Sequence, residues 1–326
     1  MSVFKRMCRM LRTLYNIENL LQNHTKSLND SIQRVPSTVR YDMRKEYLIQ
    51  QAFHCKESGI TNERYCDHEV VVSMATHADR FYEAYMAIES IMQQTIKPNR
   101  IILNVAKEEF EGKPIPPALR MQQKRGLEIN YCEDYWSFKK IIPTLRRFPE
   151  AIIITVDDDC LYNPDLLENM IICYKQDPKA IWGNRIHEIT FNDKHEVKSY
   201  MDWNWRIANT DATSINYFIT SVGGVLYPPH SLYKDVERDD IFMSICKTND
   251  DIWCYVMAVL EGTPIKKVHT HSNFGEDYIF VEDVKDSALN KINTANGAHF
   301  CKNDEIIKRV FERYKLNDIF QKRQTK

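Results

Sequence analysis

The stretch AIIITVDDDCLYNPDLLENM, residues 151–170, decides the fold class of this 326-residue chain. Ala151 to Val156 is a short apolar run rich in β-branched residues, which is typical of a buried parallel strand. Three consecutive aspartates follow it directly, and Asn163-Pro164-Asp165 then predicts the start of a helix, with proline in the first turn. A buried strand that leads through an acidic loop into a helix is a typical unit of an α/β protein.

The rest of the chain repeats this alternation of strands and helices. Further strands are predicted at 70–74, 100–105, 127–131 and 264–268, and helices at about 80–94, 137–148, 252–260 and 304–314. Such an order predicts a mostly parallel sheet covered by helices. The predicted fold class is therefore α/β, with residues 67–326 as the main domain and a helical tail from about residue 287.

Residues 1–66 are expected to form a helical extension. Apolar residues at heptad spacing run from Val3 to Leu28, interrupted only at His24, and a second helix is predicted at about 40–53. Three roles stay open for the heptad helix. It would pack on the main domain, form a coiled coil in a homo-oligomer, or bind peripherally to an anionic membrane surface through its basic residues.

Composition and charge exclude several classes of function. Lys and Arg number 44 against 45 Asp and Glu, which argues against a nucleic-acid partner bound by bulk positive charge. Neither of the common glycine-rich phosphate loops occurs, and the nine cysteines form no CxxC pair. The sequence shows no signal-peptide core and no apolar run near the roughly 20 residues of a transmembrane span. We therefore expect a cytoplasmic chain with reduced cysteines.

The first candidate site is the acidic triplet Asp157, Asp158 and Asp159. Adjacent carboxylates at the end of a buried strand repel one another and lose hydration, so they cost stability unless a cation compensates them. Alternate residues of an extended segment point the same way, which lets Asp157 and Asp159 face one ligand. Such oxygen ligands suit Mg²⁺ or Mn²⁺ holding a phosphate. The alternative is a solvated acidic turn before the next helix.

Two further patterns stand later in the chain. Asp250 and Asp251 precede the helix predicted at 252–260, where acids favour the start of a helix. Gly223 and Gly224 lie in the strand-like run SVGGVLYPP, residues 221–229. Two glycines in a strand predict a bulge or a close approach of backbone to a ligand.

Five stretches resemble GT-A-fold glycosyltransferases, particularly the family 2-like bacterial enzymes that use nucleotide-sugars. They are VVVSMATHADRFYEAYMAIESIMQQ (70–94), KPNRIILNV (97–105), IIITVDDDCLYNPDLL (152–167), SVGGVLYPP (221–229) and NDDIWCYVMAVLEG (249–262). The resemblance covers about residues 69–270. It implies a GT-A, Rossmann-like sheet and an inverting, metal-dependent transfer from a nucleotide-sugar, UDP-linked by family analogy, to a glycan or lipid-linked acceptor. Surface polysaccharide synthesis, of capsule or lipopolysaccharide, at the inner membrane face is the implied pathway.

The resemblance also implies roles for single residues. The acidic triplet matches the family's DxD motif, with Asp159 as direct ligand of Mn²⁺ or Mg²⁺ and Asp157 at the ribose or the metal, although three acids leave the register open by one. Asp251 matches the general base, with Asp250 as helper or acceptor contact. The other implied donor-binding residues are Thr76, Arg80, Asp134, Lys140, Asp158, Gly223 and Gly224, and His271 is the candidate third metal ligand.

Two other functions stay open. A sugar-nucleotidyltransferase also uses acidic metal sites on an α/β sheet, but such enzymes usually carry a glycine-rich loop after the first strand, and residues 74–80 contain no glycine. A non-catalytic polysaccharide-assembly scaffold would be a decayed transferase, and the intact carboxylates at both motifs count against decay.

Trp203 and Trp205 alternate along an extended segment, where they would either stack on an acceptor sugar or pack in the core.

Overall fold

The computed structural model describes residues 38–272, 275, 277–281 and 301–324. The chain divides into two compact units, residues 1–47 and 48–326, and each is considered by itself. In the first unit the described residues, 38–47, are helical, and this helix continues to residue 54. The heptad helix predicted from Val3 to Leu28 lies outside the described residues.

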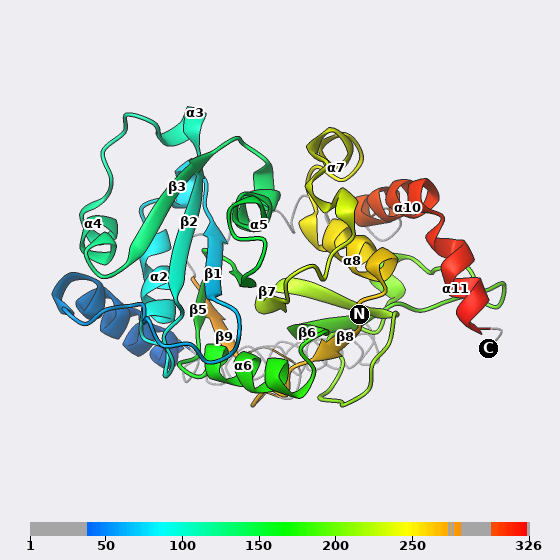
Figure 1. Cartoon of the computed structure of the whole chain (residues 1–326), viewed down its shortest axis with the longest axis horizontal. Helices are drawn as coiled ribbons and strands as arrows, with labels where there is room; N and C mark the ends of the chain where they lie inside the picture. Colours follow the sequence, from blue (N-terminus) through cyan, green and yellow to red (C-terminus); the bar gives the residue numbers. More distant parts are fainter. Residues whose placement is uncertain (1–37, 273–274, 276, 282–300, 325–326) are drawn as a thin grey trace, which may run out of the picture. The chain divides into compact units, whose positions relative to one another are not determined.

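A seven-stranded sheet, in the order β3-β2-β1-β4-β7-β6-β8, forms the centre of the second unit (Figure 1). Strands β1 to β4 are mutually parallel, β7 runs antiparallel to both of its neighbours, and β6 and β8 are parallel. The bounds are β1 Val70–Ala75, β2 Arg100–Ala106, β3 Leu127–Cys132, β4 Ile152–Val156, β6 Ile181–Glu188, β7 Tyr217–Tyr227 and β8 Ile265–Lys267. The predicted α/β class with a mostly parallel sheet is thus confirmed.

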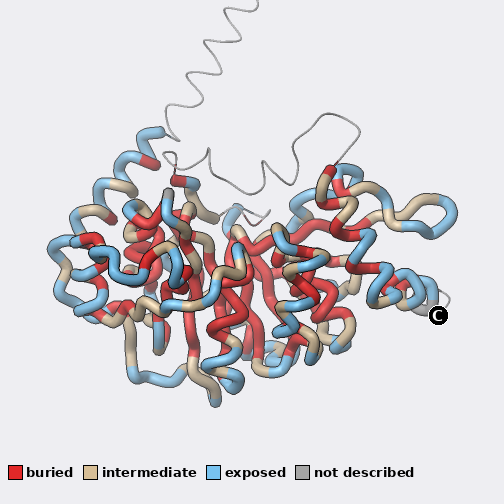
Figure 2. Tube along the Cα trace, turned by 90° about the horizontal axis from the view of Figure 1, so that it is seen from above, coloured by how far each residue is buried: buried red, intermediate tan, exposed pale blue. Residues whose placement is uncertain are grey.

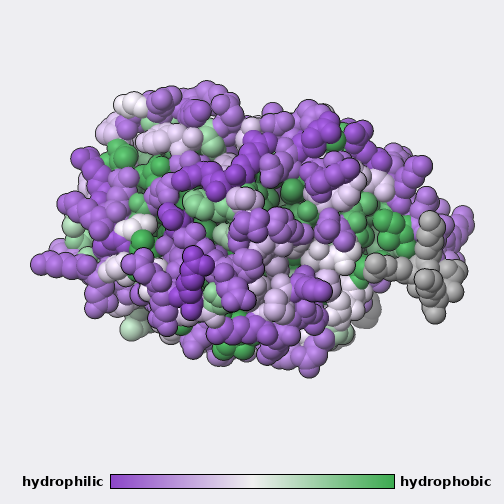
Figure 3. All heavy atoms as spheres, in the orientation of Figure 1, coloured by the Kyte–Doolittle hydropathy of each residue, from purple (hydrophilic) through white to green (hydrophobic). Residues whose placement is uncertain are grey.

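Helices cover this sheet, and a two-stranded ribbon of β5 and β9 lies beside it. The helices are α2 Ala84–Met92, α3 Lys107–Phe110, α4 Pro117–Gln123, α5 Ile142–Arg147, α6 Leu166–Gln176, α7 Asp239–Ile245, α8 Asp250–Glu261, α10 Lys302–Tyr314 and α11 Leu316–Gln324, and the ribbon pairs β5 Cys160–Tyr162 with β9 Tyr278–Phe280. Among the described residues, no helix has the length and apolarity that crossing a bilayer requires. On the face in Figure 3, hydrophilic residues predominate and hydrophobic ones form scattered groups.

The central strands are buried on both faces, as their apolar runs predict. Val70–Val72 of β1 and Ile152–Ile154 of β4 have at most 1% of their surface exposed. Figure 2 shows the buried residues concentrated along the strands. One large core cluster joins β1, β2 and β4 to α2 and α6, and another joins β6 and β7 to α8 and α10. This rigid core fixes the ends of the strands, where the acidic residues stand.

Two predicted helices are wrong in detail. The helix predicted at 80–94 begins instead as a 3₁₀ turn, Ala78–Arg80, and α2 starts only at Ala84. The helix predicted at 137–148 is split into a 3₁₀ segment, Trp136–Lys140, and α5. Pro143 lies in the first turn of α5, where its missing N–H is tolerated, but it cannot continue a helix from upstream.

The C-terminal tail packs on α8. The rings of Tyr255 and Phe311 lie 6.3 Å apart, and those of Trp253 and Tyr314 lie 5.8 Å apart. The described part of the tail, residues 301–324, is therefore part of the core around α8.

Candidate active site

The acidic triplet lies at the carboxyl edge of the sheet, beside the end of β1. Strands β1 and β4 are parallel neighbours with Met74 opposite Val156, so Thr76 and the triplet leave the sheet together. Thr76 Oγ1 donates a hydrogen bond to Asp158 Oδ2 at 2.6 Å. Ligands of open α/β sheets bind at this edge.

Arg80 binds two of the three aspartates. Its Nη1 lies 2.9 Å from Asp158 Oδ1 and 2.8 Å from Asp159 Oδ2. Burial alone would lower the pKa of Arg80, but the two carboxylates outweigh burial and raise that pKa. Arg80 is the last residue of the 3₁₀ turn Ala78–Arg80, and its guanidinium contacts the triplet from there.

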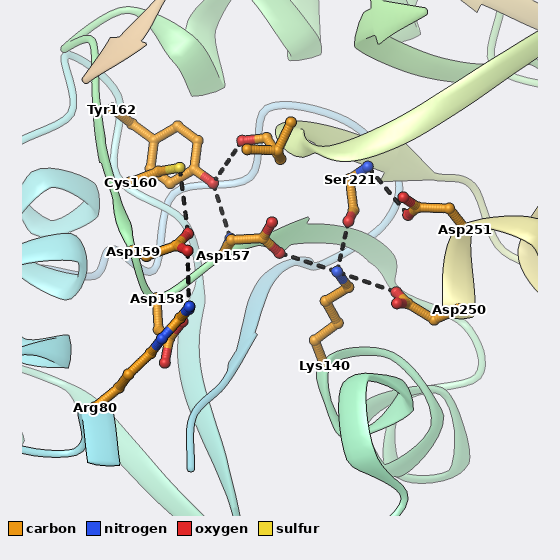
Figure 4. Close-up of polar contacts among 11 residues, drawn as sticks. Arg80, Lys140, Asp157, Asp158, Asp159, Cys160, Tyr162, Ser221, Asp250 and Asp251 are labelled. Atoms are coloured by element: carbon orange, nitrogen blue, oxygen red, sulfur yellow. Dashed lines mark hydrogen bonds and ion pairs between the residues drawn. The ribbon is translucent and has the colours of Figure 1, made fainter. Parts of the chain in front are cut away.

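Lys140 joins the triplet to the second acidic motif (Figure 4). Its Nζ lies 2.9 Å from Asp157 Oδ1, 3.0 Å from Asp250 Oδ2 and 2.5 Å from Ser221 Oγ. Burial alone would lower the pKa of Lys140, yet Asp157 and Asp250 together hold that pKa well above its usual value. One buried ammonium therefore connects β4, β7 and α8.

Asp251 lies next to this lysine cluster. Its Oδ1 accepts a hydrogen bond from the backbone N–H of Ser221 at 3.1 Å. The cap of α8 is Asn249, whose Oδ1 accepts from Ile252 N at 2.9 Å, so the side chains of Asp250 and Asp251 are not needed as helix caps. Burial and the neighbouring Asp250 raise the pKa of Asp251 to about 7, against the weaker effect of Lys140.

Negative charge exceeds positive charge in the cluster. It contains five carboxylates and two cationic side chains, namely Asp157, Asp158, Asp159, Asp250, Asp251, Arg80 and Lys140. Burial and mutual repulsion raise the pKa of both Asp157 and Asp159, although Lys140 and Arg80 oppose this. An additional cation would therefore be stabilised here.

The oxygen donors of Asp157 and Asp159 fit such a cation. Mg²⁺ is usually held by one or two carboxylates together with substrate phosphates and water, and not by a complete protein cage. Among the described residues, no group of three or more His, Cys, Asp or Glu side chains is placed to hold a metal. That Asp157 and Asp159 hold Mg²⁺ or Mn²⁺ stays a prediction.

The structure places two predicted site residues in other contacts. His271 Nε2 lies 2.6 Å from Asp165 Oδ2, and the His271 side chain is 70% exposed. Asp134 binds Lys139 and accepts a hydrogen bond from Trp136 N at 3.1 Å. Within the described residues, neither side chain forms a hydrogen bond or an ion pair with the triplet.

The two glycines of β7 lie at a bulge of that strand, where its pairing with β6 shifts. The pairing of β6 with β7 shifts between Gly183 and Arg185, and a side chain at Gly223 would meet Arg185 and Asn184 at 3.2 Å. Gly224 has φ of +90°, which favours glycine. The predicted bulge is therefore present at this point of the sheet, and the alternative, a close approach of backbone to a ligand, stays a prediction.

Sequence reasoning missed two residues that shape the cluster. Ser221 contributes both its hydroxyl, to Lys140, and its N–H, to Asp251. The hydroxyl of Tyr162 accepts from Asp157 N at 2.8 Å and donates to Val222 O at 3.0 Å. Their positions within the stretches 152–167 and 221–229 were the only signal in the sequence.

Of the two tryptophans, Trp203 is buried in the core and Trp205 is 36% exposed.

Comparison with known proteins does not identify a family. Neither protein-family models nor curated protein sequences match the chain. Among solved structures, the inositol-1-phosphate CTP transferase from T. maritima is similar with a TM-score of 0.37 and 13% identity, over 76% of this chain and 98% of that one. CMP:2-keto-3-deoxy-manno-octonic acid synthetase complexed with CTP gives a TM-score of 0.33 and 9% identity, over 62% and 90%. Similarities this weak do not establish a reaction.

Proposed function

We propose that this chain is a metal-dependent, inverting glycosyltransferase that moves a sugar from a nucleotide-diphosphate sugar to an acceptor hydroxyl. The observation that carries the proposal is the ammonium of Lys140, which lies within 3.0 Å of both Asp157 and Asp250. It brings a candidate metal and diphosphate site, Asp157 and Asp159, next to a candidate general base, Asp251. Both parts are needed for sugar transfer.

Asp251 would remove the proton from the acceptor hydroxyl. The acceptor oxygen forms a bond to the anomeric carbon, the bond from that carbon to the diphosphate breaks, and the nucleoside diphosphate leaves with the bonding electrons. A general base works best with a pKa near the operating pH, and the pKa of about 7 at Asp251 meets this condition. The hydrogen bond from Ser221 N holds one carboxylate oxygen and leaves the other for the proton.

Asp157 and Asp159 would hold the divalent cation, which when bound would neutralise charge on the leaving diphosphate. Arg80 orients Asp159 through its 2.8 Å contact, and Lys140 orients Asp157 through its 2.9 Å contact. Both side chains also add positive charge beside the leaving group. The two cations thus keep closely spaced carboxylates in position before the metal and the donor bind.

The broader predictions belong to this proposal. They are a UDP-linked donor, a glycan or lipid-linked acceptor of surface polysaccharide synthesis, and a cytoplasmic place at the inner membrane face. Residues 67–326 would be the transferase domain, and residues 1–66 the extension for packing, oligomerisation or membrane contact. Roles for Asp134 and His271 in donor or metal binding stay predictions.

A sugar-nucleotidyltransferase is the second candidate, because such enzymes also use acidic metal sites on an α/β sheet and this structure has an acidic cluster at the carboxyl edge of one. The released product separates the two reactions. Glycosyl transfer releases a nucleoside diphosphate, whereas nucleotidyl transfer from CTP to a sugar phosphate releases pyrophosphate. Incubation with each substrate class, followed by chromatography of the nucleotides, therefore decides between them.

The first experiment measures nucleotide binding by thermal shift. UDP, GDP, CDP, TDP and CTP are each tested with Mn²⁺, Mg²⁺ or EDTA, since a ligand that binds the native state raises its stability. We expect one diphosphate to stabilise the protein only with metal, and Asp159→Asn to remove this effect. Asp240→Asn, at an exposed site on α7, is the matched control.

The same variants separate catalysis from a scaffold role. Asp251→Asn should keep metal-dependent nucleotide binding and lose turnover, because only the proton acceptor is removed. If no nucleotide binds under any condition, or if the Asp251→Asn protein turns over at the original rate, the transferase proposal is wrong and a non-catalytic scaffold is favoured.

A further inference from the structure

Three buried polar atoms on β6 have no hydrogen-bond partner in the part of the chain that the structure describes. They are Asn184 Oδ1, Arg185 Nε and His187 Nε2. All lie within four residues, at the bulge where β6 shifts its pairing with β7. Buried polar atoms are nearly always paired, and bulges often redirect side chains beside active sites. The atoms on Arg185 and His187 lie two residues apart on one side of β6, where an anionic ligand would supply the partner that each lacks among the described residues.

Arg185 carries a charge without a carboxylate partner among the described residues. Its Nη1 donates to Thr220 Oγ1 at 3.2 Å, and Arg185 itself is half-buried. A guanidinium stays charged at all ordinary pH values, and a partly desolvated charge is costly without a counter-charge. Its planar fork matches a carboxylate or a phosphate.

His187 adds a neutral donor on the same face of the strand. It is fully buried, its Nδ1 accepts from Arg206 N at 3.0 Å, and its ring stacks on Trp205 at 4.8 Å. Burial and nearby Arg185 lower the pKa of His187 to about 3, so the imidazole is neutral. With Nδ1 as acceptor, the proton lies on Nε2, which is the unpaired atom. Residues 185 and 187 are two apart in a strand, so their side chains point to the same side of β6.

These donors lie close to the candidate base. Thr220 is paired opposite Arg185, and the next residue, Ser221, donates its N–H to Asp251. Tyr200 lies within electrostatic reach of both Asp251 and Arg185, and its ring contacts those of His187 at 6.0 Å and Trp205 at 5.3 Å. Tyr200 is buried, whereas Trp205 is 36% exposed, so the aromatic surface available to a sugar ring beside the two donors is that of Trp205.

We propose that Arg185 and His187 form a subsite for an anionic group, a carboxylate or a phosphate, on the acceptor sugar. This inference rests on the proposed function. If Asp251 is the general base, the site next to it must hold the acceptor sugar. The anion would complete the hydrogen bonds of Arg185 Nε and His187 Nε2, and so fix the orientation of the acceptor hydroxyl toward Asp251. Neutral sugars would lack this anchor.

The test uses three probes that share a pyranose ring. Glucuronate carries a carboxylate, glucose 6-phosphate carries a phosphate, and glucose carries neither. Binding to the full chain is measured by ligand-observed NMR titration, and the stronger of the two anions identifies the type of acid. We expect at least one anion to bind the native protein about tenfold or more tightly than glucose does, as charge-assisted hydrogen bonds predict.

Two variants of Arg185 test the assignment. Arg185→Gln should remove the tenfold preference for the anion, and Arg185→Lys should restore only part of it, since lysine keeps the charge and loses the fork. Arg238→Gln, at an exposed arginine, is the matched control and should keep the preference. Where Arg185→Gln fails to fold, as judged by circular dichroism, the lysine variant alone carries the test.

Three outcomes would overturn the subsite: no preference for an anion in the native protein, an unchanged preference in the Arg185 variants, or a loss of nucleotide binding with retained anion binding. The last result would place Arg185 at the donor. Nucleotide binding is followed separately in the same variants. If no nucleotide binds the native protein but the anion still depends on Arg185, the transferase proposal fails and the anion site remains.

Discussion

Replacement of Asp251 by asparagine is expected to stabilise the protein at neutral pH. Burial and the Asp250 carboxylate raise the pKa of Asp251 from an ordinary value of 3.8 to about 7. The native state therefore holds this proton more tightly than the unfolded chain does. The resulting stability is complete below about pH 4 and is lost as the pH rises to about 7. At about 1.4 kcal/mol per pKa unit, the loss amounts to about 4 kcal/mol.

The assay is urea denaturation of the native and Asp251→Asn proteins at several pH values between 4 and 8. Asparagine keeps an oxygen that accepts the Ser221 N–H and cannot ionise, so only the charge changes. The difference in unfolding free energy between variant and native protein should grow by up to about 4 kcal/mol from pH 4 to pH 7, and then level off.

Glu261→Gln provides the control, because Glu261 lies exposed at the other end of the same helix. Its difference from the native protein should not vary with pH. A flat difference for Asp251→Asn as well, or one that falls with pH, would refute the reasoning. Asp251 would then ionise as an ordinary surface acid, and the argument for it as general base would lose its physical basis.

Three further variants test the stability of the fold, one at the site and two elsewhere. Lys140→Met should lower the unfolding free energy by about 3–5 kcal/mol in chemical denaturation, because buried carboxylates lose their counter-charge, and adding Asp157→Asn should recover part of the loss. Glu89→Gln should cost a similar amount, since fully buried Glu89 accepts from Arg125 at 2.9 and 3.0 Å; an unchanged midpoint would contradict this. Gly262→Ala, at φ +79° with open space around it, should cost only about 1 kcal/mol in thermal denaturation.

The strands were predictable because each is a short apolar run between turn residues. The predicted bounds of β1, β2, β3 and β4 differ from the observed ones by one residue. The split around Pro143 was harder to predict, since the periodicity of apolar residues continues across it. The helix α11 was not predicted, because its polar composition gives little periodic signal and its stability depends on packing, with Phe320 near Phe311 at 5.9 Å.

The acidic motifs could be found in the sequence, but their connection could not. Asp157 and Asp250 are far apart along the chain, and the pairing of β4 with β7, together with the packing of α8 on β7, brings them to one lysine. Lys140 was predicted to approach phosphate, and no local pattern indicates that it bridges two motifs. The bulge next to Arg185 depends in the same way on the pairing of β6 with β7, which no short-range rule determines.

The arrangement of charges explains why such a cluster can persist in a stable fold. Five carboxylates with two cations oppose folding, and the raised pKa of Asp157, Asp159 and Asp251 expresses that opposition. The large buried cores on both faces of the sheet are what compensate for it. A cation bound at the triplet would relieve the repulsion, so ligand binding and stability are coupled through the same residues. Under the proposed function, the repulsion within the cluster is the cost of keeping these carboxylates ready for a cation, and the packed cores on the two sides of the sheet supply the stability that offsets it.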